Sequence, residues 1–275
     1  MKRHCRVLSV AFLSLAVASC ANGIREFEFY ADAFDLQNAT AQQVLDRVAS
    51  AERAHWAQLN DKATANPRFS ASNAAYYVNV GDPPLTDSMR KSLEAVKKYN
   101  DALIGLANGD SAAKLTNKLN SIVINLGEAH SSLLAPSVQG SQELLKVAKS
   151  FSPELGAAHR VLKFALKAAA RDAFRKNLVR AYPEMKKILL AFRRGSDDLY
   201  FAVISVPGEV SRAEKLKTRE LFASWVLLID STTRAMEVAV SAAMQRSPQT
   251  DLNALAEYSI EMRVLAEKIR AERNR

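Results

Sequence analysis

Residues 115–133 read LTNKLNSIVINLGEAHSSL, and this stretch decides the fold class. Its apolar side chains recur at alternating intervals of four and three residues: they are Leu115, Leu119, Ile122, Leu126, Ala129 and Leu133. An α-helix turns once in about 3.6 residues, so this spacing puts every one of these side chains on one face. The stretch therefore predicts an amphipathic helix that packs its apolar face against other helices.

Helix start and stop signals recur on both sides of this stretch. A start is predicted where a capping residue precedes an apolar repeat, and a stop where asparagine, glycine or proline follows one. The predicted starts are Thr40, Thr86, Asp110 or Ser111, Ser141, Ser152, Ser196, Ser211 and Thr250 or Asp251. The predicted stops are Asn66-Pro67, Asn108-Gly109, Pro136, Gly195 and Pro248, and Pro183 predicts a kink or a restart.

Two stretches interrupt this helical pattern. Residues 67–85 carry three prolines and a glycine and are predicted to form a long loop. In this loop Tyr76, Tyr77 and Asn79 either contact a ligand or pack on the bundle. Residues 199–206 read LYFAVISV, a run that suits a buried strand or a buried helix. We predict a helix there, because Ser196 and the two acids after it are typical of a helix start.

The whole pattern predicts an all-α fold, an elongated bundle of about six or seven long amphipathic helices. The composition agrees, since the chain has only 9 Gly and 8 Pro in 275 residues, few for a protein with many tight β-turns. No β-hairpin dipeptide lies between alternating apolar runs, and no internal repeat is present.

The first 20 residues have the features of an export signal. Lys2, Arg3 and Arg6 give a positive start, and residues 7–17 form an apolar run broken only by two serines. This run is too short to span a bilayer, which needs about 20 apolar residues, but it suits the core of a signal peptide. Its end reads Val17-Ala18-Ser19-Cys20.

These last residues resemble the lipobox of bacterial lipoproteins, in which an aliphatic residue and two small residues precede a cysteine. The resemblance implies that residues 1–19 are removed and that Cys20 receives acyl lipid, which anchors the protein in a membrane. If the source has two membranes, the resemblance implies the periplasmic face of the outer one, because Ala21 is not the aspartate that retains such proteins in the inner membrane. The alternatives are an ordinary secretory signal with an incidental cysteine and a short buried helix.

The predicted organisation then has three parts: the signal peptide 1–19, a lipidated cysteine with a tether or short docking helix over 20–38, and a helical bundle over 39–275. Cys5 and Cys20 are the only cysteines in the chain. On this prediction the mature bundle therefore has no disulfide, no thiolate nucleophile and no cysteine metal ligand.

The positive charge of the chain is concentrated in one segment. Residues 141–194 hold 13 Lys and Arg against 4 Asp and Glu, while the whole chain has a net charge of +9. Five of these cations follow at spacings of three and four and are predicted to share a helix face: Arg160, Lys163, Lys167, Arg171 and Arg175. This face is either a solvated helix surface or a docking surface for an anionic partner, most simply lipid headgroups.

The sequence gives little sign of catalysis. Glu52 and His55 form a Glu-x-x-His pair, the spacing used by di-iron helical bundles, but a second such pair and two further glutamates are missing. Glu52 and His55 are therefore weak candidates for a metal site, and we expect no cofactor. No Gly-x-Ser-x-Gly, Ser-x-x-Lys or glycine-rich phosphate loop is present.

We therefore expect a lipid-anchored binding or scaffold protein of the cell envelope, with the membrane and an envelope protein as partners. Nucleic acid is not an expected partner, because an exported protein rarely meets it and no stacking or zinc motif accompanies the basic segment. Two alternatives stay open. One is an envelope metalloenzyme with its site at Glu52 and His55, and the other is a membrane-acting protein that inserts residues 199–206.

Overall fold

The structure is a computed structural model that describes residues 4–61, 69–134, 141–166, 171–206, 208, 210–244 and 249–273. Side chains are described in these ranges except at residues 4–24, 61, 171–172, 244, 249–251 and 272–273. Within the described residues every regular element is a helix, so the predicted all-α class is confirmed. The predicted number of long helices is also confirmed, since the described ranges form seven.

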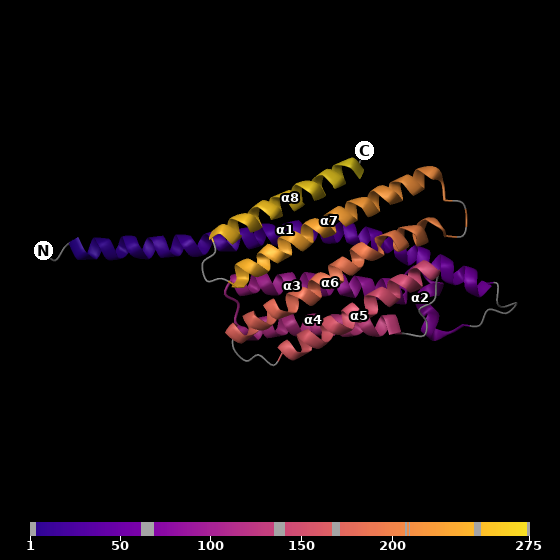
Figure 1. The fold of residues 1–275 in the computed structure, drawn as a ribbon, viewed down its shortest axis with the longest axis horizontal. Coiled ribbons are helices and arrows are strands. Elements are labelled where there is room, and N and C mark those ends of the chain that lie inside the picture. Colours follow the sequence, from indigo (N-terminus) through magenta and orange to yellow (C-terminus); the bar gives the residue numbers. More distant parts are fainter. Residues whose placement is uncertain are drawn as a thin grey trace.

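The long helices are α1 (His4–Asp61), α3 (Pro84–Ala107), α4 (Ala112–Leu134), α5 (Gln142–Ala165), α6 (Arg171–Ile204), α7 (Arg212–Met244) and α8 (Gln249–Arg273). Two short turns lie between α1 and α3: a 3₁₀ turn at Ala71–Asn73 and the single-turn helix α2 at Ala74–Tyr77. The long helices lie side by side along the longest axis of the molecule and form an elongated bundle (Figure 1).

Helix α3 runs antiparallel to α1 and packs against it, each helix from α4 to α8 does the same with the helix before it, and α8 returns to pack on α1 and α7 (Figure 1). The C-termini of α3, α5 and α7 therefore lie at the same end of the bundle. Figure 1 shows that α1 extends away from the bundle at this same end. We call it the N-terminal end of the bundle.

The first helix begins far earlier than the sequence predicts. Residues 25–38 are part of α1, and four of their apolar side chains are buried in the core: Phe27, Tyr30, Ala33 and Phe34. Residues 25–38 are thus neither a tether nor a short docking helix but a packed part of the long helix α1. The bundle starts before residue 39, and Thr40 is a buried residue inside α1 rather than a cap. The buried positions continue at intervals of three and four residues through the polar Gln37, which hides the repeat in the sequence.

Several predicted helix boundaries are confirmed by cap geometry. The Ser141 side chain accepts the backbone N–H of Leu144 at the start of α5. The Ser211 hydroxyl accepts the N–H of Glu214 at 3.2 Å and caps α7. Gly109 follows α3 with a φ of +80°, a left-handed conformation that glycine adopts without steric cost.

Other predicted boundaries are wrong, because tertiary packing carries the helix through them. Helix α5 continues through Ser152-Pro153, and α6 continues through Pro183 and past Gly195 and Ser196. Both prolines lie on the exposed side of their helices, where water can bond the carbonyl that each proline leaves free. The sequence also misses a boundary, since α5 ends at Ala165 and α6 begins at Arg171.

One hydrophobic core runs through the whole bundle, from Phe27 to Ala266. All six apolar residues of the repeat at 115–133 are buried in it, as predicted. Residues 199–204 form the last turns of α6, so the prediction of a helix is confirmed for them, while residues 205 and 206 lie just past its end. Leu59 and Leu216 continue the apolar spacing of α1 and α7 but are 53% and 40% exposed, and each lies within five residues of a helix end. Within the described residues, no helix has the length and apolar character needed to cross a bilayer.

Candidate functional site

The Glu52 carboxylate binds the N-terminus of α3. It accepts the backbone N–H groups of Leu85 and Thr86 at 3.1 and 3.0 Å and the Thr86 hydroxyl at 2.9 Å. The Tyr76 hydroxyl also donates to it, at 3.2 Å. The first N–H groups of a helix have no partner inside the helix, so a carboxylate at this position replaces a capping side chain. Thr86, which the sequence predicts as the cap, lies inside the first turn and is held by Glu52.

Burial changes the acidity of this carboxyl group. Glu52 is fully buried, and loss of solvation raises its pKa from 4.5 to about 7, although the hydrogen bonds from Leu85, Thr86 and Tyr76 lower it. Near neutral pH, Glu52 therefore exists in both protonation states while the protein is folded.

His55 lies one turn further along α1 and binds a different helix. Its Nε2 is 2.9 Å from the carbonyl oxygen of Ala202 in the last turn of α6. Since a carbonyl oxygen only accepts, the imidazole donates this hydrogen bond. Glu52 and His55 thus fix the start of α3 and the end of α6 on the same stretch of α1.

These contacts weigh against the weak prediction of a metal site at this pair. The carboxylate oxygens already accept four hydrogen bonds, and the His55 nitrogen that faces α6 is bound to a carbonyl. Among the described side chains, no three His, Cys, Asp or Glu residues lie close enough together to hold a metal ion.

The loop after α1 is held by the same part of that helix. Tyr76 stacks on Trp56 with ring centroids 5.0 Å apart, and Tyr77 contacts the edge of Trp56 at 5.1 Å. Arg53 donates to the carbonyl oxygens of Ala75 and Gly81. Of the alternatives for this loop, the structure has packing on the bundle for Tyr76 and Tyr77, while Asn79 is exposed.

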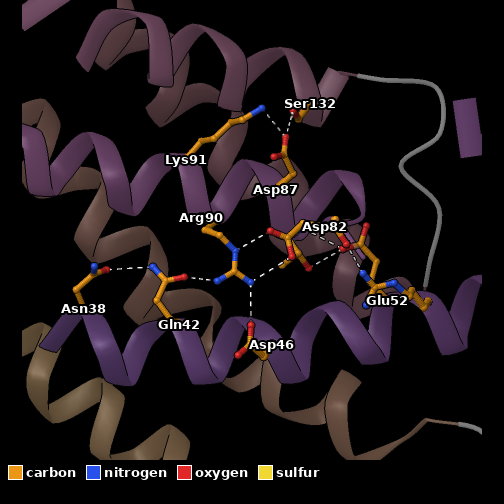
Figure 2. A network of polar contacts seen from close by, with 12 residues as sticks. Asn38, Gln42, Asp46, Glu52, Asp82, Asp87, Arg90, Lys91 and Ser132 are labelled. Carbon is orange, nitrogen blue, oxygen red and sulfur yellow. Dashed lines mark hydrogen bonds and ion pairs between the residues drawn. The ribbon is translucent and has the colours of Figure 1, made fainter. Parts of the chain in front are cut away.

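Figure 2 shows the polar network that continues from Glu52 along α1 and α3. Arg90 of α3 binds both oxygens of Asp82, at 2.6 and 3.2 Å, and reaches across to Gln42 and Asp46 of α1. Lys91 and Ser132 share the Asp87 carboxylate, at 2.9 and 2.6 Å. These side chains join three helices to one another, so we assign the network a structural role.

The predicted basic face is divided between two helices. Arg160 and Lys163 lie on α5, and Arg175 lies on α6. Lys167 and the side chain of Arg171 lie outside the described residues. The expectation of one continuous helix face is therefore wrong, because α5 ends at Ala165 and the chain turns back.

The turn back brings further cations to this place. Lys176 and Arg180 are exposed and four residues apart on α6, and Arg180 lines one cavity together with Arg160. We call Arg160, Lys163, Lys176 and Arg180 the α5–α6 basic surface. Lys176 and Arg180 were not among the predicted cations, although their spacing puts them on one helix face.

The α5–α6 basic surface differs from the rest of α6 in its ion pairs. Further along this helix, four cations pair with acids of α5, α6 or α7: Lys186, Lys187, Arg193 and Arg194. None of the four cations of the basic surface forms an ion pair with a described residue. Their charge is therefore available to an external anion.

A cavity of about 260 Å³ lies within this surface. It is lined by Arg160, Val161, Phe164, Ala165, Asn177 and Arg180, which include no acid. Asn177 of α6 donates to the carbonyl oxygen of Ala165 at 3.2 Å and thereby closes the last turn of α5. Phe164 is 61% exposed. The cavity thus combines apolar walls with two exposed guanidinium groups.

Hydrogen bonds across the bundle place this surface at its N-terminal end. The Tyr30 hydroxyl of α1 donates to Asn100 of α3, and the neighbouring Tyr99 donates to the carbonyl oxygen of Leu178, both at 2.8 Å. Leu178 is two residues from Arg180 in sequence. The cavity therefore lies level with the first buried turns of α1, where that helix extends from the bundle (Figure 1).

A second, larger cavity of about 1380 Å³ lies between α1 and α7, and Ile269 near the end of α8 also lines it. Its charged lining residues have both signs: Asp46, Arg47, Glu214, Lys217 and Glu220. Arg47 pairs with Glu214 at 3.7 Å and donates to Thr218. Because its charges are mixed and partly paired, this groove does not select an ionic partner of one sign.

Comparison with known proteins adds no relative to this description. No family model, no curated protein and no solved structure matches the chain.

Proposed function

We propose that this chain is a lipid-anchored binding or scaffold protein of the cell envelope, which lies against an anionic membrane through its α5–α6 basic surface. One observation carries the proposal: the four cations of this surface are exposed, pair with no described residue, and belong to the parts of α5 and α6 that lie at the end of the bundle from which α1 extends. The lipid at Cys20 would hold the chain on the membrane, and the basic surface would orient the bundle on it.

The position of Cys20 supports this arrangement. It lies five residues before Arg25 in α1, a rise of about 8 Å along a helix. An acylated Cys20 would therefore keep the N-terminal end of the bundle, with its basic surface, close to the lipid headgroups. The opposite end of the bundle would remain free to contact an envelope protein.

Electrostatic attraction at this surface would be moderate. A lysine or arginine near an anionic membrane contributes about 1 kcal/mol, and this attraction decreases within a Debye length, about 8 Å at physiological salt. Four such cations stabilise a preferred orientation of an anchored protein, but they do not replace the lipid anchor.

Charge reversal tests the proposal. The full chain carrying Cys20→Ser, which cannot be acylated there, is mixed with vesicles of phosphatidylcholine alone or with phosphatidylglycerol. We expect Arg160→Glu with Lys163→Glu to weaken binding to the anionic vesicles about tenfold or more, because two attractive charges become repulsive. Binding to neutral vesicles measures any contribution of the apolar leader and is subtracted.

The matched control reverses Lys149 and Lys215, two exposed lysines that lie away from this surface. It changes the net charge by the same amount, so a general charge effect would weaken the vesicle binding of both variants equally. Equal binding of the wild type and of Arg160→Glu with Lys163→Glu, or equal loss in the control, would contradict the proposed docking surface.

A further inference from the structure

We propose that the cavity between α5 and α6 binds one molecule of an anionic phospholipid. Arg160 and Arg180 would hold the phosphate, and Val161 and Phe164 would contact the first part of an acyl chain. The inference rests on the proposed function, because docking on the membrane brings lipid to this cavity. It adds a discrete binding site to what would otherwise be a diffuse attraction between charges.

The lining residues supply both halves of such a site. Guanidinium groups bind phosphate through two parallel hydrogen bonds, which favours arginine over lysine wherever phosphate is recognised. Here the two cations that line the cavity are both arginines, one from each helix. The remaining lining residues are apolar except for Asn177, whose amide is bound to Ala165.

The size and exposure of the cavity match part of a lipid rather than a whole one. A volume of about 260 Å³ lies below the roughly 300–1,000 Å³ that encloses a drug-sized ligand. A phosphate with the first carbons of its chain fits a space of this order, and the rest of the molecule would stay in the bilayer. Phe164 is exposed, and phenylalanine is one of the residues that interfacial helices bury at the boundary between headgroups and acyl chains.

A free anion or an acidic peptide fits these observations less well. An anion alone would leave the apolar walls of the cavity and the Phe164 ring in water. An acidic peptide would bind the two arginines through its carboxylates, but these charged side chains would not cover the apolar part of the lining. Charge and apolar surface together favour an amphiphilic anion.

The test separates a lipid site from simple surface charge. The full chain carrying Cys20→Ser is titrated with dihexanoylphosphatidylglycerol, a soluble short-chain lipid, below its micelle concentration. We expect binding of one molecule, weakened about tenfold or more by Arg160→Lys with Arg180→Lys, since lysine keeps the charge but not the paired hydrogen bonds. Phe164→Ser should also weaken it.

The matched control is Arg212→Lys with Arg219→Lys on α7, which should bind the short-chain lipid as the wild type does. Glycerol phosphate and short-chain phosphatidylcholine serve as probes for the headgroup phosphate alone and for a neutral lipid. Circular dichroism checks that each variant has the helix content of the wild type.

Four results would overturn the inference: no saturable binding by the wild type, equal binding by the Arg160→Lys and Arg180→Lys variant, glycerol phosphate binding as tightly as the lipid, or phosphatidylcholine binding as tightly. Binding to anionic vesicles distinguishes failure of the discrete lipid site from failure of the proposed function. If charge-dependent vesicle binding persists while the short-chain lipid does not bind, only the discrete site is wrong. If vesicle binding does not depend on charge, the docking surface itself is wrong.

Discussion

At Glu52, burial and hydrogen bonding act in opposite directions on the same carboxyl group. Burial raises its pKa, while the N–H groups and hydroxyls that it accepts lower it, and burial has the larger effect. The sequence suggested a metal ligand here because Glu-x-x-His is a ligand spacing. The tertiary structure instead uses both side chains to bind the unpaired ends of α3 and α6.

This pKa makes the stability of the protein depend on pH. The carboxyl group of Glu52 has a pKa of about 7 when folded and 4.5 as its ordinary value, so the folded state holds the proton more tightly. Its contribution to stability is complete below pH 4.5 and is lost as the pH rises through 7. By linkage the loss amounts to about 3 kcal/mol.

We therefore expect the free energy of unfolding of the wild type, relative to that of Glu52→Gln, to fall by about 3 kcal/mol between pH 4.5 and pH 8. The glutamine cannot ionise, so the variant removes this one titration while it keeps a similar shape. Urea unfolding at several pH values measures the difference. Glu257→Gln, at an exposed position of α8, is the control, and a constant difference between wild type and Glu52→Gln would show that Glu52 does not titrate in this range.

At the scale of the helix, α4 and α5 pack through two reciprocal contacts between histidine and glycine. His159 Nε2 lies 3.3 Å from the point where a Cβ atom at Gly127 would stand, and His130 Nε2 lies at the same distance from that point at Gly156. The absence of a side chain at each glycine lets a ring of the facing helix approach. The histidines, which the sequence left without a role, therefore fill the space between two helices.

We expect Gly127→Leu to destabilise the protein by about 1–3 kcal/mol, because the added side chain overlaps with the His159 ring. The double variant Gly127→Leu with His159→Ala should lose less free energy of unfolding than the two single variants lose together, since removing the ring makes room for leucine. Urea unfolding of the four proteins measures this coupling. Strict additivity would mean that Gly127 and His159 do not pack on each other as described.

Element boundaries show where local signals fail. Ser141 and Ser211 were predicted as caps and are caps, since the side chain of each accepts a backbone N–H of the helix that follows it. Ser152-Pro153 gives the same local signal inside α5. There Phe151 and Leu155 are buried on either side of the proline, and their packing outweighs the lost backbone hydrogen bond.

At the scale of the whole molecule, one core joins all seven long helices, and α1 contributes to it from Phe27 onward. A lipid at Cys20 would therefore be attached close to the folded bundle rather than at the end of a flexible tether. On the proposed function, such an anchor would bring the α5–α6 basic surface within reach of the membrane.

We expect the native product to begin at Cys20 and to carry acyl lipid there. Its mass should equal that of residues 20–275 with a diacylglyceryl group replacing the hydrogen of the Cys20 thiol, with or without a further acyl chain on the new amine. Intact mass spectrometry of the protein from membranes of the native cell measures this, and Cys20→Ser should abolish the modification. An unmodified sulfur at residue 20 in the native product would remove the anchor from the proposal.

The sequence by itself determined the all-α class, the number of long helices and the buried face of the repeat at 115–133, because these depend on the spacing of apolar residues within one segment. Only the tertiary structure decided that residues 25–38 belong to the bundle, that the basic segment folds back into two helices, and that Glu52 and His55 bind the ends of other helices. The physical reason is that each of these outcomes depends on contacts between residues far apart in the chain, whose energies no local spacing contains.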